Sequence, residues 1–297
     1  MHSLSRPARL IAFSLLLTSM LQMHAADSTL HLTLRSRVLS RENTNEFIAK
    51  EKQVTWDAKK TALIVCDMWD EHWCKSAARR VGELAGPLNE AVKQARSKGV
   101  FIIHGPSSVT KFYEDTPQRK LAKAAPFSRT PVPLSTNERW GTTWCWPDPR
   151  REPDLPIDDS DMGCSCVGTK CAIREAWTRQ ISTIELAPGD ALTDNARETW
   201  NLLQQRGIEN VILTGVHLNM CVLGRPFGIR QMILVGKNVA LMRDMTDTMY
   251  NPEKRPMVNH FEGTDLVIAH VEKYWCPSFT SSDLTGKPAF KFKDDNR

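Results

Sequence analysis

The residues best suited to chemistry are a cysteine and an aspartate that each follow an apolar run. Cys221 comes six residues after Gly215, which follows the apolar residues 211–213. A short apolar run bounded by glycine is typical of a buried strand, so Cys221 should lie in the first turn of the next helix. Free N–H groups and the helix dipole there favour the nucleophilic thiolate. An inert core cysteine is the alternative, because most buried cysteines are small apolar residues.

Asp67 ends the apolar run 61–67 and could accept the proton of the thiol. The backbone N–H groups of His217 and of Cys221 could form an oxyanion hole, which stabilises the negative charge that develops during acyl transfer. The imidazole of His217 could line the pocket, or it could simply hold the turn. Together these groups indicate nucleophilic attack on a carbonyl carbon.

A metal site beside Asp67 is a second hypothesis. Asp70 and His72 could join His104 as ligands, although their spacing matches no specific zinc signature. The alternative for His72 is a loop residue whose ring pairs with a carboxylate. We expect no cofactor, and a divalent metal such as zinc is the alternative.

The elements that must position these residues alternate between strands and helices. We predict strands at 61–67, 100–103, 182–187, 211–213 and 239–242, and helices at 76–98, 117–124, 172–180, 221–235 and 256–275. A further helix should be capped by Thr193 or Asp194 and end at Gln205. This alternation predicts an α/β fold with a parallel sheet between helices. Asp67, His104, Asp244 and the loop before Cys221 should converge, because sites form at the carboxyl ends of such strands.

Three segments fall outside this pattern. Residues 1–26 have Arg6 and Arg9 before an apolar stretch and end in Ala25-Ala26, which is typical of a secretory signal peptide; an uncleaved membrane anchor is the alternative. Residues 27–56 form an extension in which the alternating segment 30–38 predicts a strand at a sheet edge. Residues 126–170, within the main domain at 57–297, form an insert rich in Trp and Pro, which predicts a packed lid or a partner surface. Its acids could bind Ca²⁺, but EF-hand spacing is absent, which favours a solvated loop.

Charge and composition exclude several classes of function. Removing residues 1–26 takes away two Arg and no acid, so the formal charge falls from +5 to +3, which is too weak to indicate nucleic-acid binding. No later stretch is long and apolar enough for a transmembrane helix. The eight cysteines would permit disulfides in an exported protein, and Cys66 should be an inert core thiol. We expect a periplasmic or secreted protein that acts on a small molecule and could form a homo-oligomer.

The segments ALIVCDMW (62–69) and ILTGVHLNMCV (212–222) resemble motifs of the isochorismatase-like cysteine hydrolases, which include nicotinamidases and carbamoyl-amide hydrolases. The resemblance covers roughly residues 57–276. It implies a three-layer α/β/α fold and an Asp–Lys–Cys triad, with Cys221 as nucleophile and Asp67 as base. It also implies a cis peptide at Val216–His217 and an oxyanion hole formed by the amides of His217 and Cys221. Candidates to line the pocket are Trp69, His104 and Asn219.

The chain departs from this family in its cation. The family Lys would fall near residues 186–188, and no Lys occurs between Lys170 and Lys237. Arg225 could substitute for it, since residues i and i+4 share a helix face. Other candidates are Lys170, Arg174 and Arg179. Pro226 would also remove a hydrogen bond early in the nucleophile helix, so the chain resembles a divergent branch.

We therefore predict an exported cysteine hydrolase that cleaves a small amide through a thioester, in the manner of a nicotinamidase. The alternative is a catalytically silent binding protein with the same fold, which the missing Lys favours. Vinyl-ether hydrolysis, the isochorismatase reaction, is a third hypothesis, for which an exported protein has little use. A Cys221 pKa well below that of free cysteine would favour the enzyme, and an ordinary or raised pKa would favour the binding protein.

Overall fold

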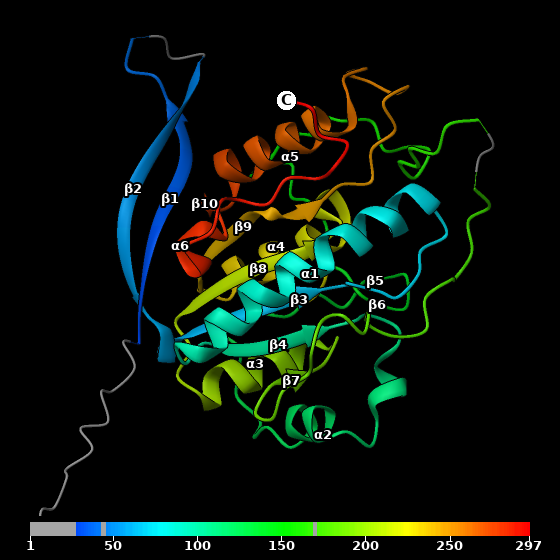
Figure 1. The fold of residues 1–297 in the computed structure, drawn as a ribbon. Coiled ribbons are helices and arrows are strands. Elements are labelled where there is room, and N and C mark those ends of the chain that lie inside the picture. Colours follow the sequence, from blue (N-terminus) through cyan, green and yellow to red (C-terminus); the bar gives the residue numbers. More distant parts are fainter. Residues whose placement is uncertain (1–27, 43–45, 169–170) are drawn as a thin grey trace, which may run out of the picture.

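A computed structural model describes residues 28–42, 46–168 and 171–297, so the signal peptide predicted at 1–26 lies outside the described residues. The centre of the fold is an eight-stranded sheet with the strand order β2-β1-β10-β9-β8-β3-β4-β7 (Figure 1). β1 (Thr29–Leu39) and β2 (Phe47–Asp57) form an antiparallel hairpin, and β1 also pairs antiparallel with β10 (Ser278–Phe279). The other neighbouring strands run parallel.

The parallel strands carry the proposed chemistry at their carboxyl ends. They include β3 (Thr61–Cys66), β4 (Phe101–Gly105), β7 (Ala191–Leu192), β8 (Asn210–Val216) and β9 (Asn238–Asp247). Every residue of β3, β4 and β8 is buried, which explains their nearly continuous apolar sequences. Because Cys66 pairs with Gly215, the segments that follow β3 and β8 leave the sheet side by side.

Helices cover both faces of the sheet. Leu63 and Val65 of β3 pack in one apolar cluster with α1 (Lys75–Ser97), whereas Ala62 and Ile64 pack in a second cluster with α3 (Ala196–Gln205), α4 (Ile229–Leu234) and α5 (His260–Tyr274). The remaining α-helices of the described chain are α2 (Pro117–Lys123) and α6 (Ser282–Thr285). The predicted three-layer α/β/α architecture with a mostly parallel sheet is confirmed. In the described part of the chain, no helix combines the length and apolar character that crossing a membrane requires.

Several predicted elements are wrong. The sheet edge belongs to β2, and the predicted edge strand β1 lies one position further in. Residues 172–180 form no helix, and the strand predicted at 182–187 is replaced by β7 at Ala191–Leu192. The cap of α3 is Asn195 rather than Thr193 or Asp194, because its side chain accepts hydrogen bonds from the N–H groups of Arg197 and Glu198. The insert holds a small hairpin of β5 (Glu138–Arg139) and β6 (Thr142–Thr143).

Candidate active site

The segment after β8 places Cys221 beside the end of β3. A cis peptide joins Val216 to His217, as the family resemblance implied, and a single π-helical turn, Leu218–Val222, follows. Gly215 has φ +97°, and a Cβ there would lie 2.1 Å from the carbonyl oxygen of Cys66. Glycine is therefore required at this position beside the end of β3.

The nucleophile helix is shorter than predicted. Cys221 lies in the π-helical turn, and the regular helix α4 begins only at Ile229 rather than running from Cys221 to Val235. Pro226 lies in the interruption, where it cannot donate the backbone hydrogen bond that a continuous helix needs. The Arg225 N–H still donates to the Cys221 carbonyl, at 2.8 Å, so one helical turn links the thiol residue to the cation.

Asp67 follows β3 directly and is completely buried. One carboxylate oxygen accepts a hydrogen bond from the Ser107 N–H at 2.7 Å, and the other accepts one from Arg225 Nε at 2.9 Å. The Asp67 backbone adopts φ +45°, a left-handed conformation that Asp tolerates better than most residues. The carboxylate is thus fixed at both oxygens between two strand ends.

Arg225 occupies the position of the expected cation, and its side chain is also fully buried. Besides Asp67, it donates from Nη1 to Thr142 Oγ1 at 2.6 Å and to the Trp140 carbonyl at 3.3 Å. Its guanidinium carbon lies 5.5 Å from the centre of the Trp144 ring. The insert therefore provides hydrogen-bond acceptors for the guanidinium of Arg225, which lies on the segment that carries Cys221. Sequence reasoning did not assign this role to the insert.

The other proposed cations have different positions. Arg174 lines the cavity described below, and Arg179 is half exposed, with Nε 3.8 Å from Asp70. Lys170 lies outside the described residues. Of the three candidates that the structure describes, Arg225 is therefore the one that forms an ion pair with Asp67.

The electrostatics keep the resting thiol protonated. Burial raises the pKa of Cys221 to about 12; the nearby Arg225 charge lowers that pKa, whereas the charge and hydrogen bonding of Asp67 raise it further. The backbone N–H of His217 is directed at the sulfur and lowers the pKa. The expectation of a resting thiolate is therefore wrong, because desolvation at this buried turn outweighs the neighbouring cation and amide.

A cavity of about 390 Å³ opens over the thiol, and both Cys221 and Arg225 line it. Its remaining walls are mainly aromatic and apolar. Trp69 and Trp177 stack with ring centres 4.3 Å apart, and His72 stacks against Trp177 at 5.7 Å. Besides Arg174 and His217, the other lining residues are Trp73, Ser108, Trp140, Gly141, Met162, Ile173, Glu175, Met220 and Met249. From the Trp-rich insert, Trp140 lines the cavity, whereas Trp144 packs against Gly224.

Two buried polar atoms on the cavity-lining residues have no partner. Among the described residues, none forms a hydrogen bond with His217 Nε2 or Trp177 Nε1. Burial, and then the nearby His72, hold the pKa of His217 well below its usual range, so the imidazole is neutral. Because a buried polar atom without a partner costs free energy, both atoms are suited to a ligand in the cavity.

Other predicted site residues lie outside this cavity. His104 is fully buried and bonds Gln180 and Asp190, each at 3.1 Å. Asn219 donates to Asp159 and to the Met249 carbonyl, both at 3.0 Å, so it holds the nucleophile turn in place. Neither lines the cavity, in contrast to the prediction, because partners within the protein already occupy their polar atoms.

The three predicted metal ligands do not converge. Asp70 accepts hydrogen bonds from Thr178, and the Nδ1 atom of His72 accepts one from the Cys74 N–H at 3.1 Å. His104 is bonded elsewhere, as described above. Asp244, also expected at this end of the sheet, instead accepts hydrogen bonds from Ser281 and anchors the C-terminal segment. Sequence reasoning missed Trp177 and Thr142, because neither belongs to a motif or a regular pattern.

Comparisons with known proteins give a partial match. No family model matches the sequence, and no curated protein matches it. A cysteine hydrolase from Pseudomonas syringae is 13% identical, with a TM-score of 0.46 over 78% of this chain and 93% of that one. An isochorismatase from Pseudomonas putida is 12% identical, with a TM-score of 0.45 over 76% and 91%. An isochorismatase family protein from Burkholderia thailandensis is 13% identical, with a TM-score of 0.43 over 77% and 95%. These three solved structures, to which this chain is similar, are named as a cysteine hydrolase, an isochorismatase and an isochorismatase family protein.

Proposed function

We propose that this protein is a cysteine hydrolase that cleaves the C–N bond of a small, flat amide. The observation that carries the proposal is the meeting of Cys221, Asp67 and Arg225 at the base of an aromatic cavity. A thiol, a carboxylate and a permanent cation are the groups that acyl transfer requires, and they are buried together. A planar ring could stack on the Trp69–Trp177 wall, and its polar edge could reach His217 Nε2.

The chemistry begins with a neutral thiol. As the Cys221 sulfur attacks the amide carbon, its proton moves to Asp67, so a thiolate need not accumulate at rest. The new S–C bond leaves negative charge on the carbonyl oxygen, which the amides of His217 and Cys221 would stabilise. Return of the proton from Asp67 to the nitrogen then allows the C–N bond to break and ammonia or an amine to leave.

The same groups would complete the cycle. Asp67 takes a proton from water as the water oxygen attacks the thioester, and the proton passes to the departing sulfur of Cys221. Arg225 remains charged throughout, since its pairing with Asp67 raises an already high pKa. Every proton transfer therefore falls to Asp67, because Arg225 cannot replace a lysine that gives up its proton.

Ammonia release from a panel of small amides tests this proposal, with nicotinamide and other aromatic carboxamides included. The parent protein should hydrolyse at least one of them, and Cys221→Ser should reduce turnover to background while leaving the fold intact by circular dichroism. Hydrolysis of the same amide by Cys221→Ser at the parent rate would exclude the thiol mechanism.

A catalytically silent binding protein is the second candidate, and the raised pKa of Cys221 favours it. In that case the aromatic cavity would retain a planar ligand without changing it. Calorimetric binding of a carboxamide that is recovered intact, with equal affinity in the parent protein and Cys221→Ser, would select the binding protein. Release of ammonia would select the hydrolase.

We further propose that the protein is exported, from the signal-like sequence of residues 1–26. The mature N-terminus should then begin at or near Asp27. N-terminal sequencing of the protein recovered from the periplasm or medium would test this, and an intact Met1 on the recovered protein would contradict it.

A further inference from the structure

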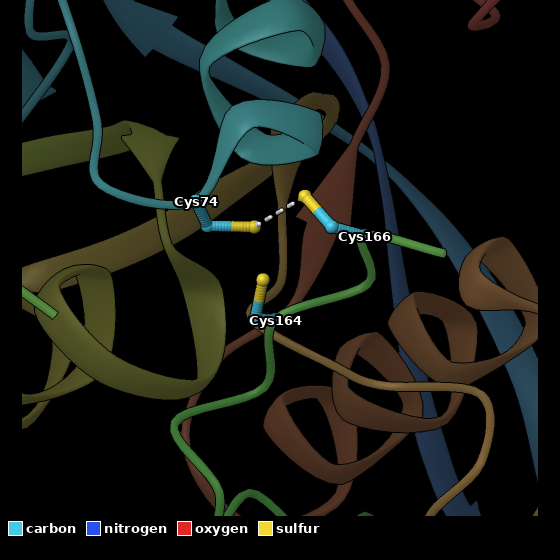
Figure 2. A group of neighbouring side chains, drawn as sticks. All are labelled: Cys74, Cys164 and Cys166. Carbon is cyan, nitrogen blue, oxygen red and sulfur yellow. Dashed lines mark hydrogen bonds between the residues drawn. The ribbon is translucent and has the colours of Figure 1, made fainter. Parts of the chain in front are cut away.

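Cysteines gather at the start of α1, outside the proposed catalytic groups. The sulfur atoms of Cys74, Cys164 and Cys166 all lie within 4.8 Å of one another. Figure 2 shows Cys74 at the turn that enters α1 and the other two on the loop that faces it, with the three thiols pointing toward a common centre. Among the described residues, this is the one group of three or more His, Cys, Asp or Glu side chains whose ligand atoms converge so closely.

The spacing of the sulfurs suits a metal ion. The Zn–S bond of about 2.3 Å in a tetrahedral site places the sulfurs about 3.8 Å apart. Cys74 and Cys166 have a sulfur–sulfur distance of 3.9 Å, and Cys171 supplies a further sulfur 3.4 Å from that of Cys166. A disulfide would join only two of these atoms. Several thiolates around one point select a soft cation such as Zn²⁺ over Mg²⁺ or Ca²⁺.

Neighbouring groups hold these sulfurs in place. The Ser76 N–H donates to the Cys166 sulfur at 3.3 Å from the first turn of α1, where the helix dipole favours negative charge. Between the two loop cysteines, Ser165 receives a hydrogen bond from Arg80 at 3.1 Å, and Arg80 pairs with buried Asp247 at 2.7 Å. Such outer contacts orient the ligands of a metal site.

The path of the loop is fixed on its other side as well. Gly163 precedes Cys164 and has φ +67°, and a Cβ there would lie 2.2 Å from the backbone of Met249. Only glycine fits this close approach. The loop is therefore confined between the Met249 backbone and α1, with its two cysteines directed at Cys74.

The cluster also adjoins one side of the cavity, here called its outer wall, which includes Trp73, Met162 and the segment 173–177. Trp73 directly precedes Cys74, Met162 lies two residues before Cys164, and Ile173 lies two residues after Cys171. All three neighbours line the cavity. An ion at the cluster would therefore join the wall segment at Met162 to the start of α1, beside Trp73.

We propose that Cys74, Cys164 and Cys166 bind one zinc ion, and that this ion fastens the outer wall of the cavity to α1. Binding releases the protons of the thiols to solvent, so affinity rises with pH. The site differs in residues and place from the Asp70, His72 and His104 set that the sequence suggested.

Metal content of the full chain tests the proposal without any substrate. The protein is reduced, incubated with Zn²⁺, desalted and analysed by mass spectrometry for bound metal. We expect one zinc per chain, and with Co²⁺ we expect the thiolate-to-cobalt absorption bands in the near ultraviolet. Cys166→Ala should weaken zinc binding by more than the roughly 10- to 100-fold that changes to outer contacts cost.

Two further variants serve as controls. Cys276→Ala makes the same substitution at a buried core cysteine and should keep one zinc per chain. Cys221→Ser should also keep it, so failure of the hydrolase proposal would leave this result unchanged. Cys164→Ala repeats the test should Cys166→Ala fail to fold.

Either of two results would overturn the proposal. One is a reduced parent protein that binds less than a tenth of an equivalent of zinc or shows no cobalt–thiolate absorption. The other is unaltered zinc binding by a folded Cys164→Ala or Cys166→Ala variant. Peptide mapping of the unreduced protein would then show whether the cysteines pair in disulfides instead.

Discussion

The base and the outer wall of the cavity are built in different ways. Asp67 and the Cys221 turn follow adjacent parallel strands, and their charged groups are buried and paired. The wall residues 173–177 belong to a segment without helix or strand, which Asp70 attaches through the Thr178 N–H and hydroxyl. Groups that need fixed geometry thus lie at strand ends, whereas groups that select the shape of a ligand lie on a loop. Changes at the base should therefore alter rate and stability, and changes at the wall should alter affinity.

The largest expected effect is at the carboxylate of Asp67, beneath the cavity. Asp67→Asn keeps the shape of the side chain but cannot take the thiol proton, so turnover of the amide found by screening should fall by roughly 10²- to 10⁴-fold. Asp190→Asn is the matched control, because Asp190 is also a buried carboxylate, bonded to His104 and Arg96 away from the cavity. Steady-state kinetics should show the Asp190 variant within a few-fold of the parent. Parent-like turnover in Asp67→Asn would remove Asp67 from the mechanism.

Arg225 should affect stability as well as rate. Arg225→Met leaves Asp67 as a buried charge without its cation, which should cost about 3–5 kcal/mol of unfolding free energy. Arg230→Met breaks a similarly buried pair with Glu152, at 2.6 Å, and should destabilise the protein by a comparable amount. Urea denaturation measures both. Only Arg225→Met should also lower turnover, and equal turnover loss in the two variants would mean that the Arg225 effect is merely structural.

The positions of Asp67, Cys221 and Arg225 were largely predictable from sequence, because short local patterns mark the strands and turns that carry them. The buried runs that became β3 and β8 read directly as strands, and parallel pairing brings their carboxyl ends together. Arg225 followed from helical spacing with Cys221, although Pro226 interrupts the helix just beyond it. The protonated state of Cys221 was not predictable, since it depends on how deeply the folded chain buries the sulfur.

The wall was poorly predictable because distant contacts decide it. Residues 172–180 have helical composition, yet Trp177 stacks on Trp69 and the Thr178 N–H bonds Asp70, which draws the segment out of a helix. β2 is rich in Lys and Glu, and its pairing with all of β1 makes it a strand. The cysteine cluster joins Cys74 and Cys166, which lie 92 residues apart, so local sequence spacing could not predict it.

Alkaline pH should lower the stability of the folded protein through the buried Cys221 thiol. The pKa of Cys221 is about 12 in the folded protein, against an ordinary value of 9.0, so the folded state holds the thiol proton more tightly. Its contribution to stability is complete below pH 9 and is lost as pH rises from 9 to 12, by at most about 1.4 kcal/mol per pH unit. Cys221→Ser lacks this titration, and the other buried thiols are common to both proteins. Denaturation from pH 8 to 11 should therefore show the parent losing stability faster than Cys221→Ser; parallel curves would mean that the thiol ionises as it does in the unfolded chain.

The smallest expected effect is at the wall. Trp177→Ala removes part of the wall on which the planar ligand is proposed to stack. An aromatic stack contributes about 0.5–1.5 kcal/mol, so KM should rise about 2- to 12-fold. The rate constant kcat should change little, because the base of the cavity keeps its geometry. Trp146→Ala is the matched control, since this half-exposed Trp of the insert does not line the cavity. A fall in kcat with KM unchanged would reverse the division proposed here, because the wall would then act on the reacting groups and not on the ligand alone.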